Sequence, residues 1–228
     1  MIYSEYKRDR ISTLGLSLKS GDNAAEIINC AVTAGVNYFD VTNDGNKPDH
    51  GADICKILSV LPRESYRLAA SFPGYDVLNM KSAEEVFENR LKQCGALYFD
   101  FYMFYNVGKS NVNEYLDPEN GVFDYLMKQR VNGRIKHLGL SSDGDFDVTR
   151  RFLYSYGQFM EFCQIEYTSP EDNKELTEFL KQYMIPVFAV NPSGGVDLFK
   201  ALQNKPEVKV IIAGAPDTAH LKEYLTAF

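Results

Sequence analysis

The chain has 228 residues, of which 45% are hydrophobic and 24% are charged, and this is the composition of a globular protein large enough to bury a substantial core. Its formal net charge of −7 argues against a surface that binds nucleic acid or an anionic membrane. No apolar run approaches the ~18 residues of a spanning helix, and the N-terminus lacks the basic-then-apolar order of a signal peptide. We therefore expect no nucleic-acid partner, no membrane and a cytoplasmic location.

The first half of the chain alternates apolar runs with helical patterns. Short apolar runs bounded by turn residues predict buried strands, and apolar residues at helical spacing predict helices. Asp22 is placed to cap the first helix and Gly35 to end it, and Ser82-Ala83-Glu84-Glu85 has the pattern of a capping box. The expected strands are residues 11–18, 36–40, 66–72 and 98–105, the first preceded by a hairpin, and the expected helices are residues 22–35, 51–61 and 82–95.

The second half of the chain continues the same alternation. Ser169 followed by Pro170 is typical of a helix start, with proline in the first turn, and Asp217 is placed to cap the last helix. The expected strands are residues 135–141, 160–166, 186–190 and 208–213, and the expected helices are residues 121–131, 146–156, 169–184, 196–203 and 217–228.

Eight strands that alternate with eight helices predict a single (β/α)8 barrel, a TIM barrel with short loops, over residues 1–228. The competing α/β architecture is a doubly wound open sheet. That fold usually has fewer strands, and no Gly-x-Gly-x-x-Gly motif follows the first strand here. The alternation therefore favours the barrel.

The cysteines and the scattered acidic residues give no metal-binding pattern. Cys30, Cys55, Cys94 and Cys163 are far apart in the sequence and form no Cys-x-x-Cys motif, so we expect buried reduced thiols. The acidic run 143–147 lacks the rest of a calcium loop and is expected to form a turn and a helix cap. We expect no metal site.

Asp40 is the first candidate for a functional residue, because it lies at the C-terminal end of a short buried strand. That end of a barrel strand is where barrel enzymes carry their catalytic residues. The alternative is a solvated residue at a strand end. Of the histidines, His50 is expected in a solvated loop, His137 in a packing role and His220 on a helix surface.

Six stretches, in the same order and at similar spacing, resemble motifs of the aldo-keto reductases. For example, Gly35-Val36-Asn37-Tyr38-Phe39-Asp40-Val41-Thr42 resembles the family's G-x-N-x-F-D-T-A strand. The other matching stretches are residues 14–17, 98–105, 132–141, 162–167 and 211–215. The resemblance implies a TIM barrel that binds NADP(H) across its C-terminal face and transfers a hydride to a carbonyl carbon.

The resemblance carries over only part of the family's catalytic set of Asp, Tyr, Lys and His. Asp40 matches the Asp, whereas Gly45 stands in the place of the Tyr. Ser71 stands in the place of the Lys, and Tyr105 in that of the His. Because a phenol can transfer protons, Tyr105 is the candidate for a replacement acid, and an aromatic that fills the barrel mouth is the alternative.

The family residues that hold the nicotinamide correspond to Ser141, Ser142 and Gln164, of which the first and last keep the family's residue type. These side chains could instead satisfy each other or water. The aromatic that stacks on the nicotinamide corresponds to Val190, with Asn191 beside it.

At the adenine end, the resemblance places His220 where the family often has an arginine for the 2′-phosphate and Tyr224 where it has an asparagine. The helix capped by Asp217, which follows Gly214, could bind a phosphate through its N-terminal amides.

Two hypotheses follow, and a third is weaker. The first is an oxidoreductase that uses NADP(H) or NAD(H) to reduce a small carbonyl substrate. The second is an inactive barrel of the same fold that binds a ligand or a protein partner, since a fold alone does not fix function. The third, a lyase or isomerase that uses Asp40, has no motif to support it.

Overall fold

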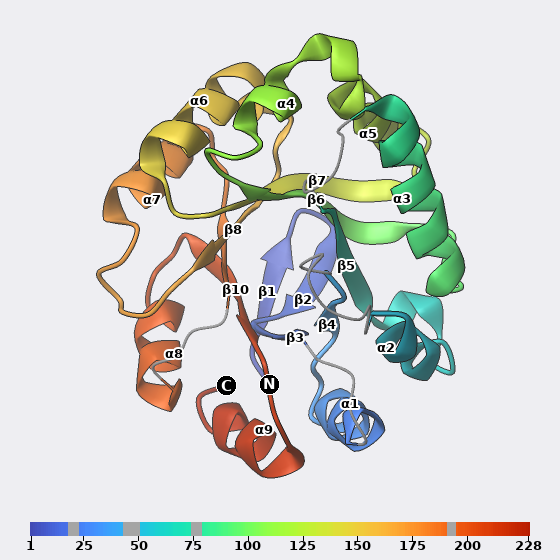
Figure 1. The fold of residues 1–228 in the computed structure, drawn as a ribbon. Coiled ribbons are helices and arrows are strands. Elements are labelled where there is room, and N and C mark those ends of the chain that lie inside the picture. The colour runs from blue at the N-terminus through green and yellow to red at the C-terminus, as the bar shows by residue number, and fades with distance from the viewer. Residues whose placement is uncertain (18–22, 43–50, 74–78, 191–194) are drawn as a thin grey trace.

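Eight parallel strands close into a barrel in the computed structural model, in the order β10-β3-β4-β5-β6-β7-β8-β9. Helices surround the barrel on the outside (Figure 1). The structure describes residues 1–17, 23–42, 51–73, 79–190 and 195–228. The barrel strands are β3 Leu14–Ser17, β4 Tyr38–Asp40, β5 Arg67–Phe72, β6 Phe99–Val107, β7 Ile135–Ser142, β8 Cys163–Glu166, β9 Val187–Val190 and β10 Val208–Ala213. The predicted (β/α)8 barrel is thus confirmed.

Helices follow the strands in the predicted alternation. They are α1 Ala24–Thr33, α2 Gly51–Leu58, α3 Met80–Gln93, α5 Val122–Val131, α6 Phe146–Tyr156, α7 Lys174–Gln182, α8 Gly195–Gln203 and α9 Thr218–Leu225, with a short additional helix, α4 Val112–Leu116, between β6 and α5. Within the described ranges, no helix is long and apolar enough to cross a membrane.

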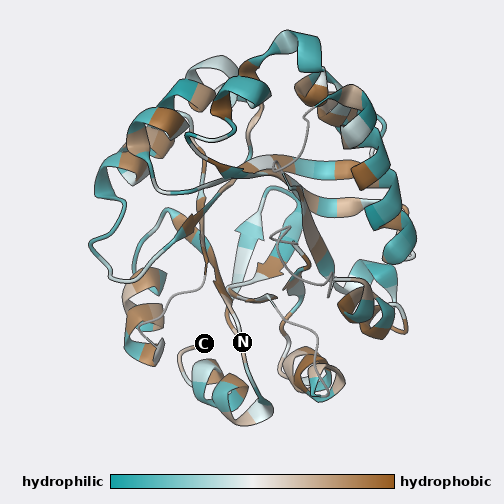
Figure 2. Cartoon of the chain, viewed as in Figure 1, coloured by the Kyte–Doolittle hydropathy of each residue, from teal (hydrophilic) through white to brown (hydrophobic). Residues whose placement is uncertain are grey.

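The strands bury both of their faces, as expected for parallel strands with an outer layer of helices. Outward side chains pack against the helices in one large apolar cluster. Inward side chains fill the barrel, so its interior is a packed core. Figure 2 shows hydrophobic residues both along the strands and on parts of the surrounding helices. The inner cluster consists of Tyr6, Ile11, Tyr38, Ala69, Phe101, Met103, Phe162, Phe188, Val210 and Ile212.

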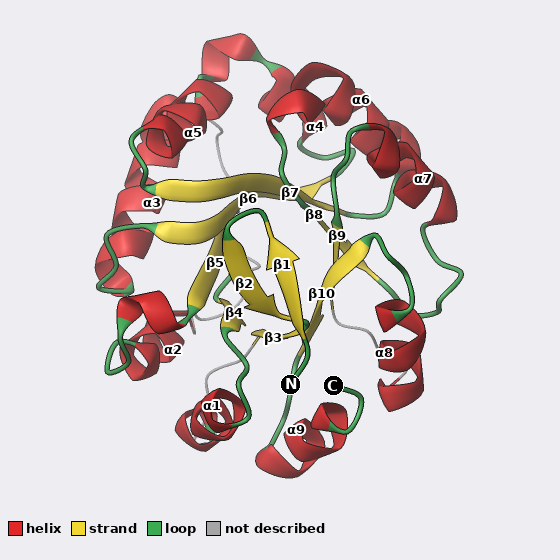
Figure 3. Ribbon diagram, turned by 180° about the vertical axis from the view of Figure 1, so that it is seen from behind, coloured by secondary structure: helices red, strands yellow, loops and turns green. Residues whose placement is uncertain are grey.

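An antiparallel hairpin of β1 (Tyr3–Tyr6) and β2 (Asp9–Ser12) covers the N-terminal end of the barrel (Figure 3). Tyr6 and Ile11 are buried in the inner cluster and close that end. The hairpin was predicted, but the single strand expected over residues 11–18 is divided. Its first part pairs with β1, and its second part enters the barrel at Leu14, because the chain turns at Thr13.

Two predicted helix starts differ from the structure. Helix α3 is capped by Asn79, whose side chain accepts a hydrogen bond from the Ser82 amide, so Ser82 is the third helical residue instead of the cap. Helix α7 is preceded by Asn173. Before it, the Asp172 carboxylate accepts hydrogen bonds from the backbone amides of Thr168 and Ser169 and holds a separate turn. The predicted cap of α9 by Asp217 is confirmed, whereas Asp22 lies outside the described residues.

The expectation that all four cysteines are reduced is wrong for two of them. Cys55 of α2 and Cys94 at the end of α3 form a disulfide, although 39 positions separate them in the sequence. The closed barrel brings the buried faces of neighbouring helices together, and sequence spacing does not show this. Cys30 and Cys163 are free, and burial raises the pKa of the Cys163 thiol above its ordinary value.

Candidate active site

Asp40 lies at the C-terminal mouth of the barrel and points into its interior. Its carboxylate accepts a hydrogen bond of 2.8 Å from the Thr42 amide at Oδ1 and one of 2.9 Å from Gln164 Nε2 at Oδ2. Strand β4, which carries Asp40, and strand β8, which carries Gln164, are on opposite sides of the eight-stranded barrel. This bond therefore spans the interior and joins two of the predicted site residues.

Asp40 is only 4% exposed. Burial raises its pKa above the ordinary value, while the hydrogen bonds from Thr42 and Gln164 and the charge of Arg90 oppose that rise. Both hydrogen-bond donors are neutral groups. Asp40 is thus a buried carboxyl group whose direct partners bring no full positive charge, and its protonated form is favoured more than that of an exposed aspartate.

Tyr38 is a buried neighbour of Asp40 that no sequence motif indicated. It lies two residues before Asp40 on the same strand, so both side chains face the interior. Its side chain is completely buried. Burial, and then the nearby Asp40 charge, raise the pKa of Tyr38 well above its ordinary value, while Gln164 opposes the rise. The period-two alternation of strand β4 was the signal that could have found it.

Ser71 and Tyr105 lie on the two strands that follow β4 around the barrel. Ser71 is buried near the end of β5, and its Oγ has no hydrogen-bond partner. Tyr105, near the end of β6, is half-buried. It follows Phe101 and Met103 at the two-residue spacing of inward positions. These two predicted residues therefore border the mouth from neighbouring strands.

Ser141 and Gln164 are paired across β7 and β8, so their backbones are adjacent at the mouth. Ser142 has the opposite orientation. Its Oγ lies 2.6 Å from Thr149 Oγ1 of helix α6 and accepts a hydrogen bond of 3.0 Å from the Gly144 amide. The hydroxyl of Ser142 thus supports the turn into α6, and of the predicted nicotinamide residues Ser141 and Gln164 are the pair brought together.

The residues predicted for the other end of the cofactor lie around the start of α9. Gly214 follows β10 and is exposed. Asp217 Oδ1 accepts a hydrogen bond of 2.9 Å from the His220 amide and lies 2.8 Å from His220 Nδ1. His220 is on the helix surface, as predicted. Asn191 lies outside the described residues, as do Gly45 and His50.

The acidic residues after β7 form a turn and a helix cap, as the sequence predicted. The Asp145 side chain accepts a hydrogen bond of 3.1 Å from the Val148 amide, and it forms an ion pair of 2.7 Å with Lys109. Asp143 Oδ1 accepts a hydrogen bond from the Asp145 amide. Among the described residues, no group of His, Cys, Asp or Glu side chains is arranged to hold a metal ion.

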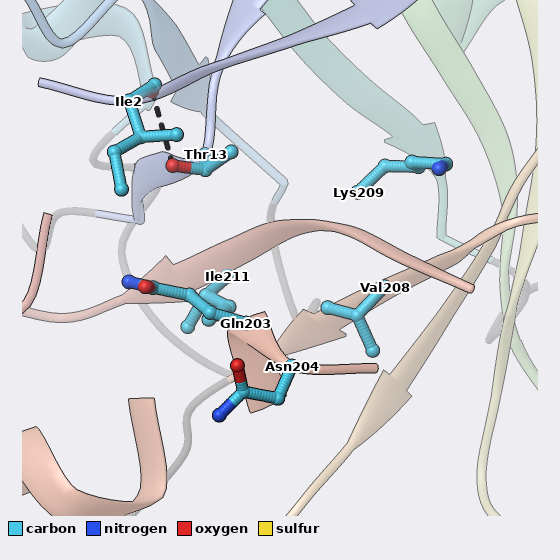
Figure 4. A pocket seen from close by; sticks show the side chains of 7 residues that line it. All are labelled: Ile2, Thr13, Gln203, Asn204, Val208, Lys209 and Ile211. Atoms are coloured by element: carbon cyan, nitrogen blue, oxygen red, sulfur yellow. Dashed lines mark hydrogen bonds between the residues drawn. The ribbon is translucent and has the colours of Figure 1, made fainter. Parts of the chain in front are cut away.

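A hollow of about 170 Å³ lies at the opposite end of the barrel, between the start of β10 and the end of α8 (Figure 4). The Thr13 hydroxyl there donates a hydrogen bond of 3.0 Å to the Ile2 carbonyl. None of its lining residues belongs to the predicted site, which is at the C-terminal mouth. The lining residues are Ile2, Thr13, Gln203, Asn204, Val208, Lys209 and Ile211.

Comparison with known proteins gives matches in structure only. No protein-family model and no curated protein sequence matches the chain. An aldo/keto reductase from Brucella melitensis superposes with a TM-score of 0.79 at 18% identity, over 100% of this chain and 93% of that one. A thermostable aldo-keto reductase, solved with the inhibitor epalrestat, superposes with a TM-score of 0.81 at 20% identity, over 100% of this chain and 94% of that one.

The holo form of an aldo-keto reductase from Bacillus halodurans gives a TM-score of 0.77 at 14% identity, over 100% of this chain and 90% of that one. At identities this low, the superpositions establish a shared fold only, and the chemistry has to be argued from the site residues. From its first to its last residue, the chain has the fold of the aldo-keto reductases.

Proposed function

We propose that this protein is an oxidoreductase of the aldo-keto reductase type, which uses NADP(H) or NAD(H) to reduce a small carbonyl compound at the C-terminal mouth of the barrel. The observation that carries the proposal is the hydrogen bond between Gln164 and Asp40 across the barrel interior. It fixes a carboxyl group and an amide at the place where barrel enzymes act.

An unsatisfied hydroxyl group near this bond supports a ligand at the mouth. Buried polar atoms are nearly always hydrogen-bonded in folded proteins, so an exception calls for an explanation such as a bound molecule or an ordered water. Ser71 Oγ is such an exception. A polar ligand or ordered water at the mouth would complete the hydrogen bonding of Ser71.

The residues at the mouth fit the nicotinamide end of the cofactor. A carboxamide has both donors and an acceptor, which the Gln164 carbonyl and the Ser141 hydroxyl can match. At the other end, the His220 ring is hydrogen-bonded to the Asp217 carboxylate. Because of this bond, His220 is a weaker partner for a 2′-phosphate. Both NADP(H) and NAD(H) are therefore candidates. When bound, the cofactor supplies the hydride.

Tyr105 is the proposed proton donor to the carbonyl oxygen. It is only half-buried, so a substrate at the mouth can reach its phenol, whereas Tyr38 is fully buried. As the carbonyl carbon gains a hydride, its oxygen takes the phenolic proton and becomes a hydroxyl group. Asp40 and Gln164 form the polar floor beneath this reaction.

Calorimetric titration with NADPH and with NADH tests the cofactor site. We expect binding by the wild type, weakened about tenfold to a hundredfold in Gln164→Leu, because a buried hydrogen-bonding group is lost from the floor. Gln203→Leu is the matched control, since that amide lies at the opposite end and bonds the Ala227 carbonyl. No binding by the wild type, or equal affinity in both variants, would refute the proposed site.

Two observations favour a second function, a ligand-binding barrel without turnover. The amide nitrogen of Gln164 is already bonded to Asp40, and Ser71 supplies no positive charge where the resemblance implies a lysine. Such a barrel would bind nucleotide or another small molecule without reducing a carbonyl compound. Nucleotide binding without turnover over a broad panel of aldehydes and ketones would favour this alternative.

A further inference from the structure

His137 lies between two carboxylates at the N-terminal end of the barrel. Its Nε2 is 3.0 Å from Asp9 Oδ2, and its Nδ1 is 2.8 Å from Glu161 Oε2. Asp9 belongs to the hairpin that covers this end, whereas His137 and Glu161 belong to β7 and to the segment before β8. The imidazole therefore connects the hairpin to the barrel wall.

The donors in this arrangement can be counted. An ionised carboxylate only accepts hydrogen bonds, and a neutral imidazole has a single N–H. With a neutral ring, one of the two short contacts would set a nitrogen lone pair against a carboxylate oxygen. Both contacts are hydrogen bonds only when the ring has a proton on each nitrogen.

Both carboxylates have further cationic partners that keep them ionised. Arg67 Nε lies 2.9 Å from Asp9 Oδ1, and Glu161 forms ion pairs with Lys7 and Arg130. Burial alone would raise the pKa of Glu161, but the hydrogen bonds from His137 and Lys7 and the charges of His137 and Arg130 lower it to about 2.

For Asp9 too, burial acts to raise the pKa, but the His137 hydrogen bond and then the Arg67 charge lower it overall. Arg67, Lys7 and Arg130 favour the ionised carboxylates independently of the ring, so the two short contacts require a proton on each nitrogen of His137.

Aromatic groups complete the surroundings of the ring. The Tyr6 ring meets His137 edge-on, with centroids 5.0 Å apart, and the Phe101 ring lies 4.9 Å away. Burial, then Glu161, raise the pKa of Tyr6 above its ordinary value, so this phenol stays neutral. The ionisable groups around the ring are thus Tyr6 on β1, Lys7 in the turn, Asp9 on β2, Arg67 on β5, Arg130 on α5, Lys136 on β7 and Glu161 before β8.

We propose that His137 is a cationic latch that fastens the N-terminal hairpin onto the barrel. With a proton on each ring nitrogen, it donates one hydrogen bond to Asp9 of the hairpin and one to Glu161 of the barrel wall. Each bond then joins a charged donor to a charged acceptor, which is the stronger class of hydrogen bond. Replacing the ring with a neutral side chain should therefore loosen the hairpin.

The ¹⁵N chemical shifts of the His137 ring nitrogens at neutral pH test the charge state, with His137→Gln to assign the signals. We expect both nitrogens to have shifts of the protonated type, in a hydrogen-bonded imidazolium. A Glu161→Gln variant removes one carboxylate and should move the ring signals toward those of a neutral tautomer at the same pH. A neutral ring in the wild type at neutral pH would overturn the proposal.

Hydrogen exchange of the β1 and β2 amides tests the latch. At neutral pH, protection should be about tenfold or more lower in His137→Gln than in the wild type, while circular dichroism shows an intact barrel. His220→Gln, which changes an exposed histidine, should behave as the wild type. Equal protection of the hairpin amides in His137→Gln and in the wild type would contradict the latch.

Discussion

The carboxyl group of Asp40 is bonded by the Gln164 amide from the opposite wall of the barrel. The family resemblance implies a lysine at the end of the third strand of the barrel, whereas that position holds Ser71. A neutral amide does not offset burial as an ammonium would, so the pKa of Asp40 is raised. The floor of the mouth is therefore polar but less charged than a reductase site with all four family residues.

Tyr105 is the residue on which turnover depends in this account. Tyr105→Phe removes only the phenolic proton, so we expect kcat for carbonyl reduction to fall about 10²- to 10⁴-fold while nucleotide affinity stays the same. Tyr154→Phe, at an exposed tyrosine of α6, is the matched control and should leave kcat unchanged. Steady-state assays with NADPH or NADH measure both, and unchanged turnover in Tyr105→Phe would remove it from the mechanism.

Part of the candidate site could be predicted from single residues. Asp40 was found from its place at a strand end, and the family resemblance indicated Gln164, although 124 positions separate the two and sequence alone gives no sign of their hydrogen bond. Ser142 was expected beside Ser141, but adjacent strand residues face opposite sides, and its hydroxyl contacts α6. The same alternation would have indicated Tyr38.

At the scale of elements, helix starts show where local sequence signals compete. Ser82 was predicted as the cap of α3 because a serine followed by glutamates fits a capping box. Asn79 is an equally good cap three residues earlier, and the two side chains bond each other's backbone amides. The local sequence pattern thus predicts the helix, but it does not show which of the two polar residues caps it.

The disulfide between α2 and α3 is expected to stabilise the fold. Closing a 39-residue separation is worth about 4 kcal/mol in the chain-entropy model. Urea unfolding should therefore show a loss of about 2–4 kcal/mol on reduction, and a similar loss in Cys55→Ser. Cys30→Ser, at a free half-buried cysteine, is the control and should respond to reductant as the wild type does. Equal stability with and without reductant would contradict a structural role for the bond.

At the scale of the whole molecule, the barrel could be predicted because its signal repeats. Each βα unit is marked independently by an apolar run and a helical pattern, so an error in one boundary does not change the fold. The hairpin was foreseen only in outline, since its role depends on long-range contacts such as that between Asp9 and His137, which are 128 positions apart. Closure of the barrel brings such residues together.

The two ends of the barrel are connected by the packed aromatic interior. Tyr6 of the hairpin contacts Phe101 and Phe188, with ring centroids 5.6 and 5.8 Å apart. The same two rings pack against Tyr38, which lies beneath Asp40. The latch at one end and the mouth at the other therefore share one rigid core, which holds the polar floor in place.

Transfer of deuterium from C4-deuterated NADPH or NADH to a carbonyl substrate tests the central claim most directly. The wild-type protein is incubated with the labelled nucleotide and a panel of aldehydes and ketones, and the alcohols are analysed by mass spectrometry. We expect one deuterium on the former carbonyl carbon of at least one product. Tight nucleotide binding with no deuterium in any product would contradict the oxidoreductase and leave a ligand-binding barrel.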